Sequence, residues 1–98
     1  MPRARAAGRS WFVYMLKCRG DCIYTGITPD VRARFLKHRA GAGGAFTHSH
    51  PPLRILAAMR CASRSEALKA EYALKQLARP DKQRWARAWR WPAGPPGA

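Results

Sequence analysis

Two short runs of strand-forming residues, separated by a turn, constrain the fold of this chain more than any other feature. Residues 11–17 (WFVYMLK) and 23–27 (IYTGI) are rich in β-branched and aromatic side chains, which favour strands. Between them, Arg19-Gly20-Asp21 has the composition of a tight turn. The segment is therefore expected to form a β-hairpin, and the turn length decides which side chains share a face.

A turn of three residues would place Cys18 opposite Cys22 and Tyr14 opposite Gly26. Cross-strand partners share a face, so Tyr14 and Tyr24 would then be diagonal neighbours roughly 7–8 Å apart. Gly26 would leave space opposite Tyr14 where another residue has a side chain. A turn of even length would send the two rings to opposite faces. The structural alternative is that both tyrosines are core aromatics with satisfied hydroxyl groups.

The hairpin is followed by a predicted helix and a third strand. Thr28 is expected to be the N-cap of the helix, with proline at the first helical position and Asp30 in the first turn. Gly41 is expected to end the helix. Residues 41–52 form a loop with Gly, His and Pro, and residues 53–61 are predicted to be a strand.

A capping box predicts where the second long helix begins. Ser63 and Glu66 have the spacing of that motif, and the helix is expected to continue to about Ala78. Pro80 is expected to break it, and Asp81 to cap a short last helix. Trp85 and Trp89 lie one turn apart on that helix, which predicts that they cover the core.

The predicted order is β-β-α-β-α-α, which indicates a single α/β (α+β) domain with a mainly antiparallel three-stranded sheet flanked by helices. A chain of 98 residues suits one such domain. We expect the domain to occupy residues 10–91, with a flexible basic tail at 1–9 and a flexible Pro/Gly tail at 92–98.

The charge of the chain is strongly unbalanced. Nineteen Lys and Arg residues against five Asp and Glu give a formal net charge of +14. Such a charge favours a polyanionic partner, most commonly nucleic acid, over an anionic membrane surface. The sequence has no apolar run long enough to cross a membrane, no signal peptide, and an odd number of cysteines, three. We therefore expect a soluble cytoplasmic protein.

The first helix places polar groups beside its apolar stripe. Val31 and Phe35 should face the core, and the 3.6-residue period brings Arg34 and His38 to the edge of the same side. A guanidinium at that position requires an anionic partner. The alternative is that Arg34 extends to solvent and that His38 is a surface residue.

Glu71 falls within the apolar arc of the second long helix, where a carboxylate is usually paired or bound to a metal. An ion pair with Lys75, one turn later, is the simpler explanation. The other four acids have structural roles in turns and caps: Asp21, Asp30, Glu66 and Asp81. A nuclease with two metal ions needs several convergent carboxylates, so this chain could use only one ion and one carboxylate, a combination that suits Mg²⁺.

The runs Val13-Tyr14-Met15 and Tyr24-Thr25-Gly26 together resemble the paired motif of the GIY-YIG nuclease superfamily. More narrowly, the chain resembles its small stand-alone bacterial members, the YhbQ-like (UPF0213) group, from residue 11 to about residue 85. The resemblance implies the β-β-α-β-α-α fold. It also implies that five residues are catalytic, the last of them being the metal ligand: Tyr14, Tyr24, Arg34, His38 and Glu71.

The implied activity is that of a metal-dependent endonuclease, a hydrolase of phosphodiester bonds that uses Mg²⁺ or Mn²⁺. The resemblance implies a nucleic-acid substrate. We expect DNA more than RNA, a role in DNA repair or recombination, and low sequence specificity. Tyr24 or Tyr14 would act as general base or relay the proton. A tyrosine pKa near 10 is too high for this role, so Arg34 and the metal ion would have to lower it. Arg34 would stabilise the transition state, and His38 would orient a tyrosine hydroxyl.

The loop after the first helix departs from the family pattern, since relatives tend to have Lys and Arg there and residues 41–50 have neither. Two interpretations therefore stay open, an endonuclease and a non-catalytic nucleic-acid-binding module of the same fold. A third is that the Trp- and Arg-rich segment 84–91 stacks on single-stranded bases or lies on a membrane. We predict nucleic-acid contacts from six residues: Lys17, Arg32, Lys37, Thr47, His48 and Lys75.

Overall fold

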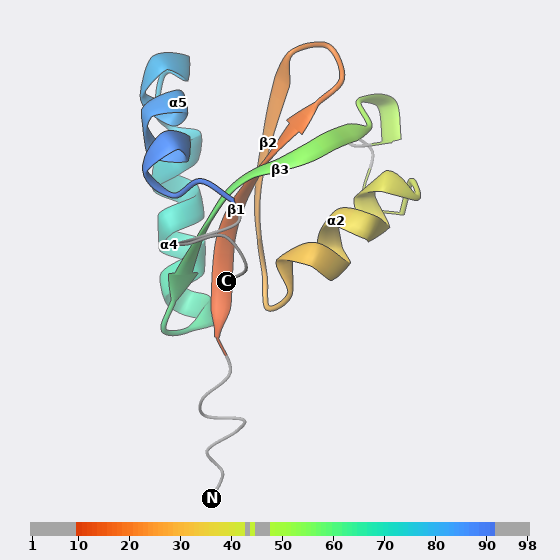
Figure 1. The fold of residues 1–98 in the computed structure, drawn as a ribbon. Coiled ribbons are helices and arrows are strands. Elements are labelled where there is room, and N and C mark those ends of the chain that lie inside the picture. The colour runs from red at the N-terminus through yellow and green to blue at the C-terminus, as the bar shows by residue number, and fades with distance from the viewer. Residues whose placement is uncertain (1–9, 43, 45–47, 92–98) are drawn as a thin grey trace, which may run out of the picture.

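The computed structural model describes residues 10–42, 44 and 48–91, and the two predicted tails lie outside these ranges. Its elements follow the predicted order β-β-α-β-α-α (Figure 1). They are β1 (Trp11–Cys18), β2 (Cys22–Thr28), α2 (Val31–Arg39), β3 (Pro52–Cys61), α4 (Arg64–Lys75) and α5 (Arg79–Ala88). Within the described ranges, no helix has the length and apolar character needed to span a membrane.

The three strands form one antiparallel sheet in the order β2-β1-β3, as predicted. The predicted hairpin register is also confirmed: Cys18 lies opposite Cys22, and Tyr14 lies opposite Gly26. In the turn, Gly20 and Asp21 have φ values of 84° and 60°, in the left-handed region that glycine and aspartate tolerate best. The three-residue turn therefore places both tyrosines on one face of the sheet.

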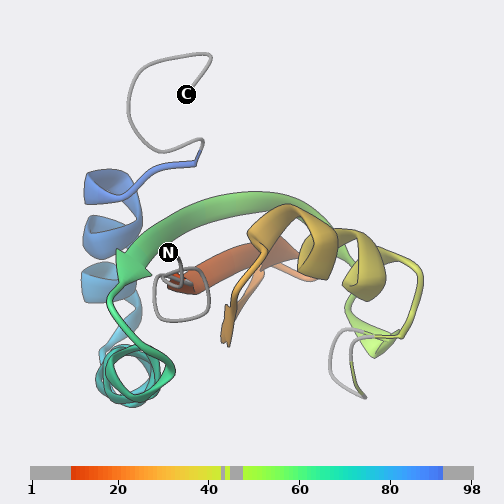
Figure 2. The same ribbon diagram turned by 90° about the horizontal axis from the view of Figure 1, so that it is seen from below.

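The sheet is covered on both faces. Helices α4 and α5 lie on one side and α2 lies on the other (Figures 1 and 2). Because side chains alternate along a strand, Val13 and Met15 of β1 pack on the α4–α5 side, whereas Tyr14 and Leu16 pack on the α2 side. The central position of β1 explains why its sequence is a nearly continuous apolar run.

The start of α2 differs from the prediction. Asp30, not Thr28, is the N-cap, and its Oδ1 accepts a hydrogen bond from the backbone N–H of Ala33 at 3.0 Å. Thr28 is the last residue of β2, and its hydroxyl accepts from the N–H of Asp30 at 3.1 Å. The threonine therefore closes the strand-to-helix turn, while the aspartate caps the helix. Gly41, with φ of 84°, follows the helix as predicted.

The boundary between the last two helices also differs. Ser63 caps α4 as predicted, with its hydroxyl accepting from Glu66 N at 3.1 Å, but α4 ends at Lys75 rather than near Ala78. Pro80 lies in the first turn of α5. Backbone N–H groups in the first turn form no intrahelical hydrogen bond, so the lack of an N–H in proline costs nothing there. Ala78 is therefore the N-cap, without a side-chain hydrogen bond, and Asp81 lies in the first turn instead of capping the helix.

After α5 the chain returns to the outer edge of β3. Trp89 O accepts from Ala58 N at 3.0 Å, and Trp91 N donates to Leu56 O at 2.9 Å. Trp85 packs against the core as predicted, but Trp89 is 42% exposed. This segment covers β3 from Leu56 onward, because two backbone hydrogen bonds fix it there.

Candidate active site

The ring of Tyr14 lies across the hairpin, over Gly26. A Cβ atom on Gly26 would stand 2.7 Å from Tyr14 Oη and 3.1 Å from Tyr24 Cε2. The two tyrosine rings have their centroids 6.3 Å apart. The absence of a side chain at position 26 is therefore what allows the two phenol rings to lie next to each other on this face of the sheet.

Helix α2 adds His38 to this pair. Tyr14 Oη lies 3.0 Å from His38 Nε2, and the Tyr24 and His38 rings meet edge to face with centroids 5.0 Å apart. His38 is fully buried, as is Val31 two turns earlier. The stripe on α2 was predicted correctly, but His38 lies inside the packed layer rather than at its edge, because Tyr14 supplies the polar partner that an imidazole needs there.

Burial controls the protonation of these groups. It raises the pKa of Tyr14 to about 12, although a hydrogen bond from Arg34 acts in the opposite direction. Burial, and then the charge of Arg34, lower the pKa of His38 below 6.5. Arg34 therefore lowers the Tyr14 pKa as expected, but desolvation outweighs it. Arg34 donates to the phenol oxygen of Tyr14, and the same oxygen shares a hydrogen bond with His38 Nε2 whose direction follows the histidine tautomer.

Arg34 connects the buried pair to the surface. It is half-buried, and it lines a hollow of about 210 Å³ at the junction of β2 and α2 together with Lys37, Thr28 and Asp30. One guanidinium thus contacts the Tyr14 hydroxyl and also borders a surface hollow that has a second cation on its wall. This is a suitable arrangement for an anionic ligand.

Glu71 lies on α4, which packs against β1 and β2 from the other side of the sheet. Its side chain is 19% exposed and forms an ion pair with Lys75 at 3.1 Å. Apart from burial, the main cause, the negative charge of Glu71 contributes to the raised pKa of Tyr14. The carboxylate is therefore within electrostatic reach of the phenol.

A family model described as the GIY-YIG catalytic domain matches residues 10–84 of the chain. The chain belongs to the GIY-YIG family. A UPF0213 protein of Cupriavidus necator is 46% identical over 78 residues, covering 80% of this chain and 85% of the relative. Another, from Cupriavidus pinatubonensis, is 50% identical over 74 residues, covering 76% and 82%.

A UPF0213 protein from Bacillus halodurans, solved in solution by NMR, is 35% identical with a TM-score of 0.54, and the match covers 85% of this chain and 88% of that one. The protein is thus a small UPF0213 member of the GIY-YIG family, as its motifs predicted, and the family places it in a nuclease superfamily.

GIY-YIG nucleases generally depend on a divalent metal ion, and the donor set of this GIY-YIG protein can be compared with that need. Among the described residues, no group of three or more His, Cys, Asp or Glu side chains could hold a metal ion. Mg²⁺ commonly takes one or two protein carboxylates and completes its shell with water and substrate phosphate. A half-buried carboxylate such as Glu71 fits that mode of binding, whereas a site built from thiolates and imidazoles would need more ligands.

The predicted nucleic-acid contacts do not form one surface in this GIY-YIG protein. Lys37 lies beside Arg34, and Lys75 pairs with Glu71. Lys17 lies on the opposite face of the sheet, and Arg32 lies in a hollow on the β3 side of α2. His48 is exposed beside Gly41, and Thr47 falls outside the described residues.

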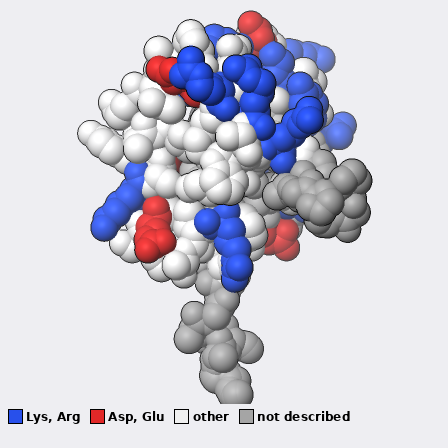
Figure 3. Space-filling view, turned by 60° about the vertical axis from the view of Figure 1, so that its left-hand side comes forward, with Lys and Arg blue, Asp and Glu red and all other residues white. Residues whose placement is uncertain are grey.

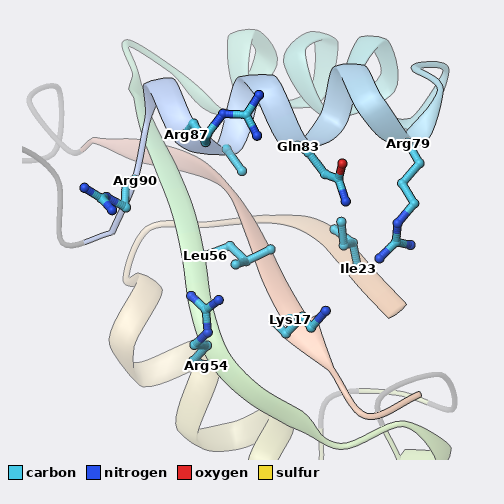
Figure 4. A pocket seen from close by; sticks show the side chains of 9 residues that line it. Lys17, Ile23, Arg54, Leu56, Arg79, Gln83, Arg87 and Arg90 are labelled. Atoms are coloured by element: carbon cyan, nitrogen blue, oxygen red, sulfur yellow. The ribbon is translucent and has the colours of Figure 1, made fainter. Parts of the chain in front are cut away.

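A second basic hollow lies between α5 and the sheet (Figure 4). The sequence did not predict the hollow, although Arg87 and Arg90 belong to the Trp- and Arg-rich segment 84–91 that it singled out. Arg79, Gln83, Arg87 and Arg90 line it from the C-terminal segment. Arg79, Gln83 and Arg87 are spaced by four residues, so they lie on one side of α5, and this periodicity was a usable signal. Arg90 lies beyond the end of the helix and bridges to Ala57. The strand residues that complete the hollow could not be paired with them without the fold.

Proposed function

We propose that this GIY-YIG protein is an endonuclease that hydrolyses phosphodiester bonds in nucleic acid, DNA in preference to RNA, with one divalent metal ion, Mg²⁺ or Mn²⁺. The observation that carries the proposal is the hydrogen-bonded series from Arg34 through Tyr14 to His38, with Tyr24 against the imidazole. It presents a guanidinium and a phenol next to a basic hollow, on a chain of net charge +14.

The difference in burial between the tyrosines supports different roles for them. Tyr14 is 1% exposed and hydrogen-bonded to His38, so it acts as a positioning residue together with that histidine. Tyr24 is only partly buried, so its hydroxyl is the one open to substrate. As the phenolate, formed by loss of its own proton to solvent under the positive charges of Arg34 and a bound metal ion, it would take the proton of the attacking water. Arg34 stabilises the negative charge that develops on the phosphoryl oxygens.

Glu71 is the residue that would hold the metal ion. The ion, when bound, supplies electrostatic stabilisation of the phosphate and of the leaving oxygen. Lys75 keeps the Glu71 side chain extended along α4 through the ion pair. The cations near the site suit backbone phosphates, which carry no sequence information directly, so we infer low sequence specificity and a role in processing structured DNA during repair or recombination.

A nicking assay tests the proposal. A panel of branched, nicked and linear DNA is incubated with Mg²⁺, Mn²⁺ or EDTA. Tyr24→Phe, Arg34→Gln and Glu71→Gln should each lower the rate by at least about a hundredfold, the usual loss when a proton-transfer or charge-stabilising group is removed. The matched control is Tyr72→Phe, whose side chain is on α4 and 70% exposed, and which should cleave like the parent. Normal cleavage by Glu71→Gln would exclude the role of the carboxylate as metal ligand.

A non-catalytic binding module is the second candidate, and one observation favours it. Tyr14 and His38 are both buried and neutral, as expected for a hydrogen-bonded pair that holds α2 on the hairpin. In that case the parent protein binds the same DNA panel, and neither metal produces cleavage. The assay on the parent protein therefore separates the two functions.

A further inference from the structure

The hollow between α5 and the sheet is strongly basic. It has a volume of about 440 Å³, and five of its lining residues are cations: Lys17, Arg54, Arg79, Arg87 and Arg90. Arg79 and Gln83 extend from α5 toward Ile23, while Arg54 reaches up from β3 (Figure 4). Lys and Arg gather over the upper part of this side of the molecule (Figure 3). We call this surface the α5 hollow.

The positive charge of the α5 hollow is only partly neutralised. Asp21 in the hairpin turn pairs with Lys17 at 2.6 Å and with Arg79 at 3.0 Å. Arg54, Arg87 and Arg90 form no ion pair with any carboxylate in the ranges that the structure describes. Cations held together without counter-charges repel one another, and an anionic ligand relieves this repulsion.

Arg54 extends this surface around the open end of β3. It also lines a second hollow, of about 380 Å³, on the α2 side of the sheet, together with Arg32, Arg39 and Trp91. The C-terminal segment covers the edge of β3 only from Leu56 onward, so Arg54 stands at the uncovered part. Arg54 therefore joins the α5 hollow to the cations on the β3 side of α2, Arg32 and Arg39. Arg34, on the same helix, lines a separate hollow.

We propose that the α5 hollow binds the backbone of a single-stranded nucleic-acid segment that continues from the substrate held at the candidate active site. The proposal rests on the nucleic-acid substrate of the proposed function, but not on hydrolysis. The hollow has the size of a site for one small molecule, so it accepts nucleotides of a single strand, while a duplex could only lie across its mouth. The apolar floor of Ile23 and Leu56 suits sugars and base faces, and a flat bilayer cannot enter a concave surface.

Binding is measured in EDTA, where no cleavage occurs, by fluorescence anisotropy of a blunt DNA duplex and of the same duplex with a single-stranded extension. Arg87→Gln and Arg90→Gln should each weaken binding to the extended DNA several-fold. Each should also reduce the slope of log affinity against log salt by about 0.7, the contribution of one phosphate contact on a single strand. Lys69→Gln, an exposed cation of α4 outside the hollow, is the single-charge control and should leave the slope unchanged.

Asp21→Asn is a variant that should change DNA affinity in the opposite direction. It removes the carboxylate that pairs with Lys17 and Arg79, and asparagine tolerates the φ of 60° at this position. It should tighten binding to the extended DNA by several-fold, a gain that misfolding cannot produce. Equal behaviour of the arginine variants and Lys69→Gln, or a loss of affinity in Asp21→Asn, would overturn the proposal.

Two further outcomes separate this proposal from other interpretations. Vesicles containing phosphatidylserine test a membrane surface. If Arg87→Gln and Arg90→Gln weaken vesicle binding but leave DNA binding unchanged, the proposal is overturned in favour of a membrane. A parent protein that cleaves DNA but shows no preference for the extension would also overturn it, leaving the proposed nuclease intact. Arginine-dependent binding of the extension without any cleavage would support the α5 hollow and contradict the nuclease.

Discussion

Replacing Gly26 by alanine tests the packing that brings the two tyrosines together. The new methyl carbon would lie 2.7 Å from Tyr14 Oη and 2.9 Å from Cζ, well inside the optimal separation of about 3.5–4.0 Å. The ring cannot move aside freely, because it is 1% exposed and its hydroxyl is hydrogen-bonded to His38. Overpacking costs about 1–3 kcal/mol, and the loss of the Tyr14–His38 hydrogen bond adds about 1 kcal/mol. The lower conformational entropy of unfolded alanine offsets about 0.5–1 kcal/mol.

We therefore expect Gly26→Ala to lower the free energy of unfolding by about 1–3.5 kcal/mol. In urea the midpoint should fall by about 1 M for a loss of about 2 kcal/mol, with the m-value unchanged. A double-mutant cycle with Tyr14→Phe supplies the control. Phenylalanine lacks the closest atom, so the cost of the alanine should fall by about 1 kcal/mol in that background. An alanine variant as stable as the parent, or an equal cost in both backgrounds, would refute the close approach of ring and glycine.

Three other predictions concern the ionisable groups. Burial and Arg34 lower the pKa of folded His38 below 6.5, so on acidification the unfolded chain binds a proton before the folded protein does. The free energy of unfolding should therefore fall below pH 6.5, by up to about 1.4 kcal/mol per pH unit. Urea titrations at several pH values measure this dependence, and His38→Gln should flatten it. Ultraviolet titration of the folded protein should show one tyrosine with a pKa of about 12, absent in Tyr14→Phe. Glu71→Gln should shift the urea midpoint by less than the equivalent of about 0.5 kcal/mol, and a larger loss would indicate a structural role for the carboxylate.

The hairpin shows how much of the site was available from the sequence. Side chains alternate with a period of two, so the odd turn length alone placed Tyr14 and Tyr24 on one face and Gly26 opposite Tyr14. The strands are long, and each has a clear composition. Local signals therefore fixed the register, and the register fixed the relation of the two rings.

The burial and protonation state of the site residues could not be predicted from local sequence patterns, because they depend on contacts between residues far apart in the chain. The stripe on α2 placed His38 near the core, but its full burial depends on Tyr14, 24 positions away, as hydrogen-bond partner. The α5 hollow has the same origin, because Lys17 and Arg54 come from strands that pair only in the folded sheet. Helix ends were misplaced for a smaller reason: Thr28 and Asp30 can both cap, and only the end of β2 decides between them.

The use of the five acids connects the fold to the proposed chemistry. Asp30 and Glu66 accept backbone hydrogen bonds at the starts of helices. Asp21 and Asp81 pair with basic side chains at the surface. Glu71 also has a partner, Lys75, but a pair between residues one turn apart contributes only about 0.3–0.5 kcal/mol. The Glu71 side chain is nevertheless only 19% exposed, which is more burial than a pair of that strength explains. Under the proposed function, Glu71 is therefore the acid of the described residues that would hold the metal ion, because the other four have structural partners.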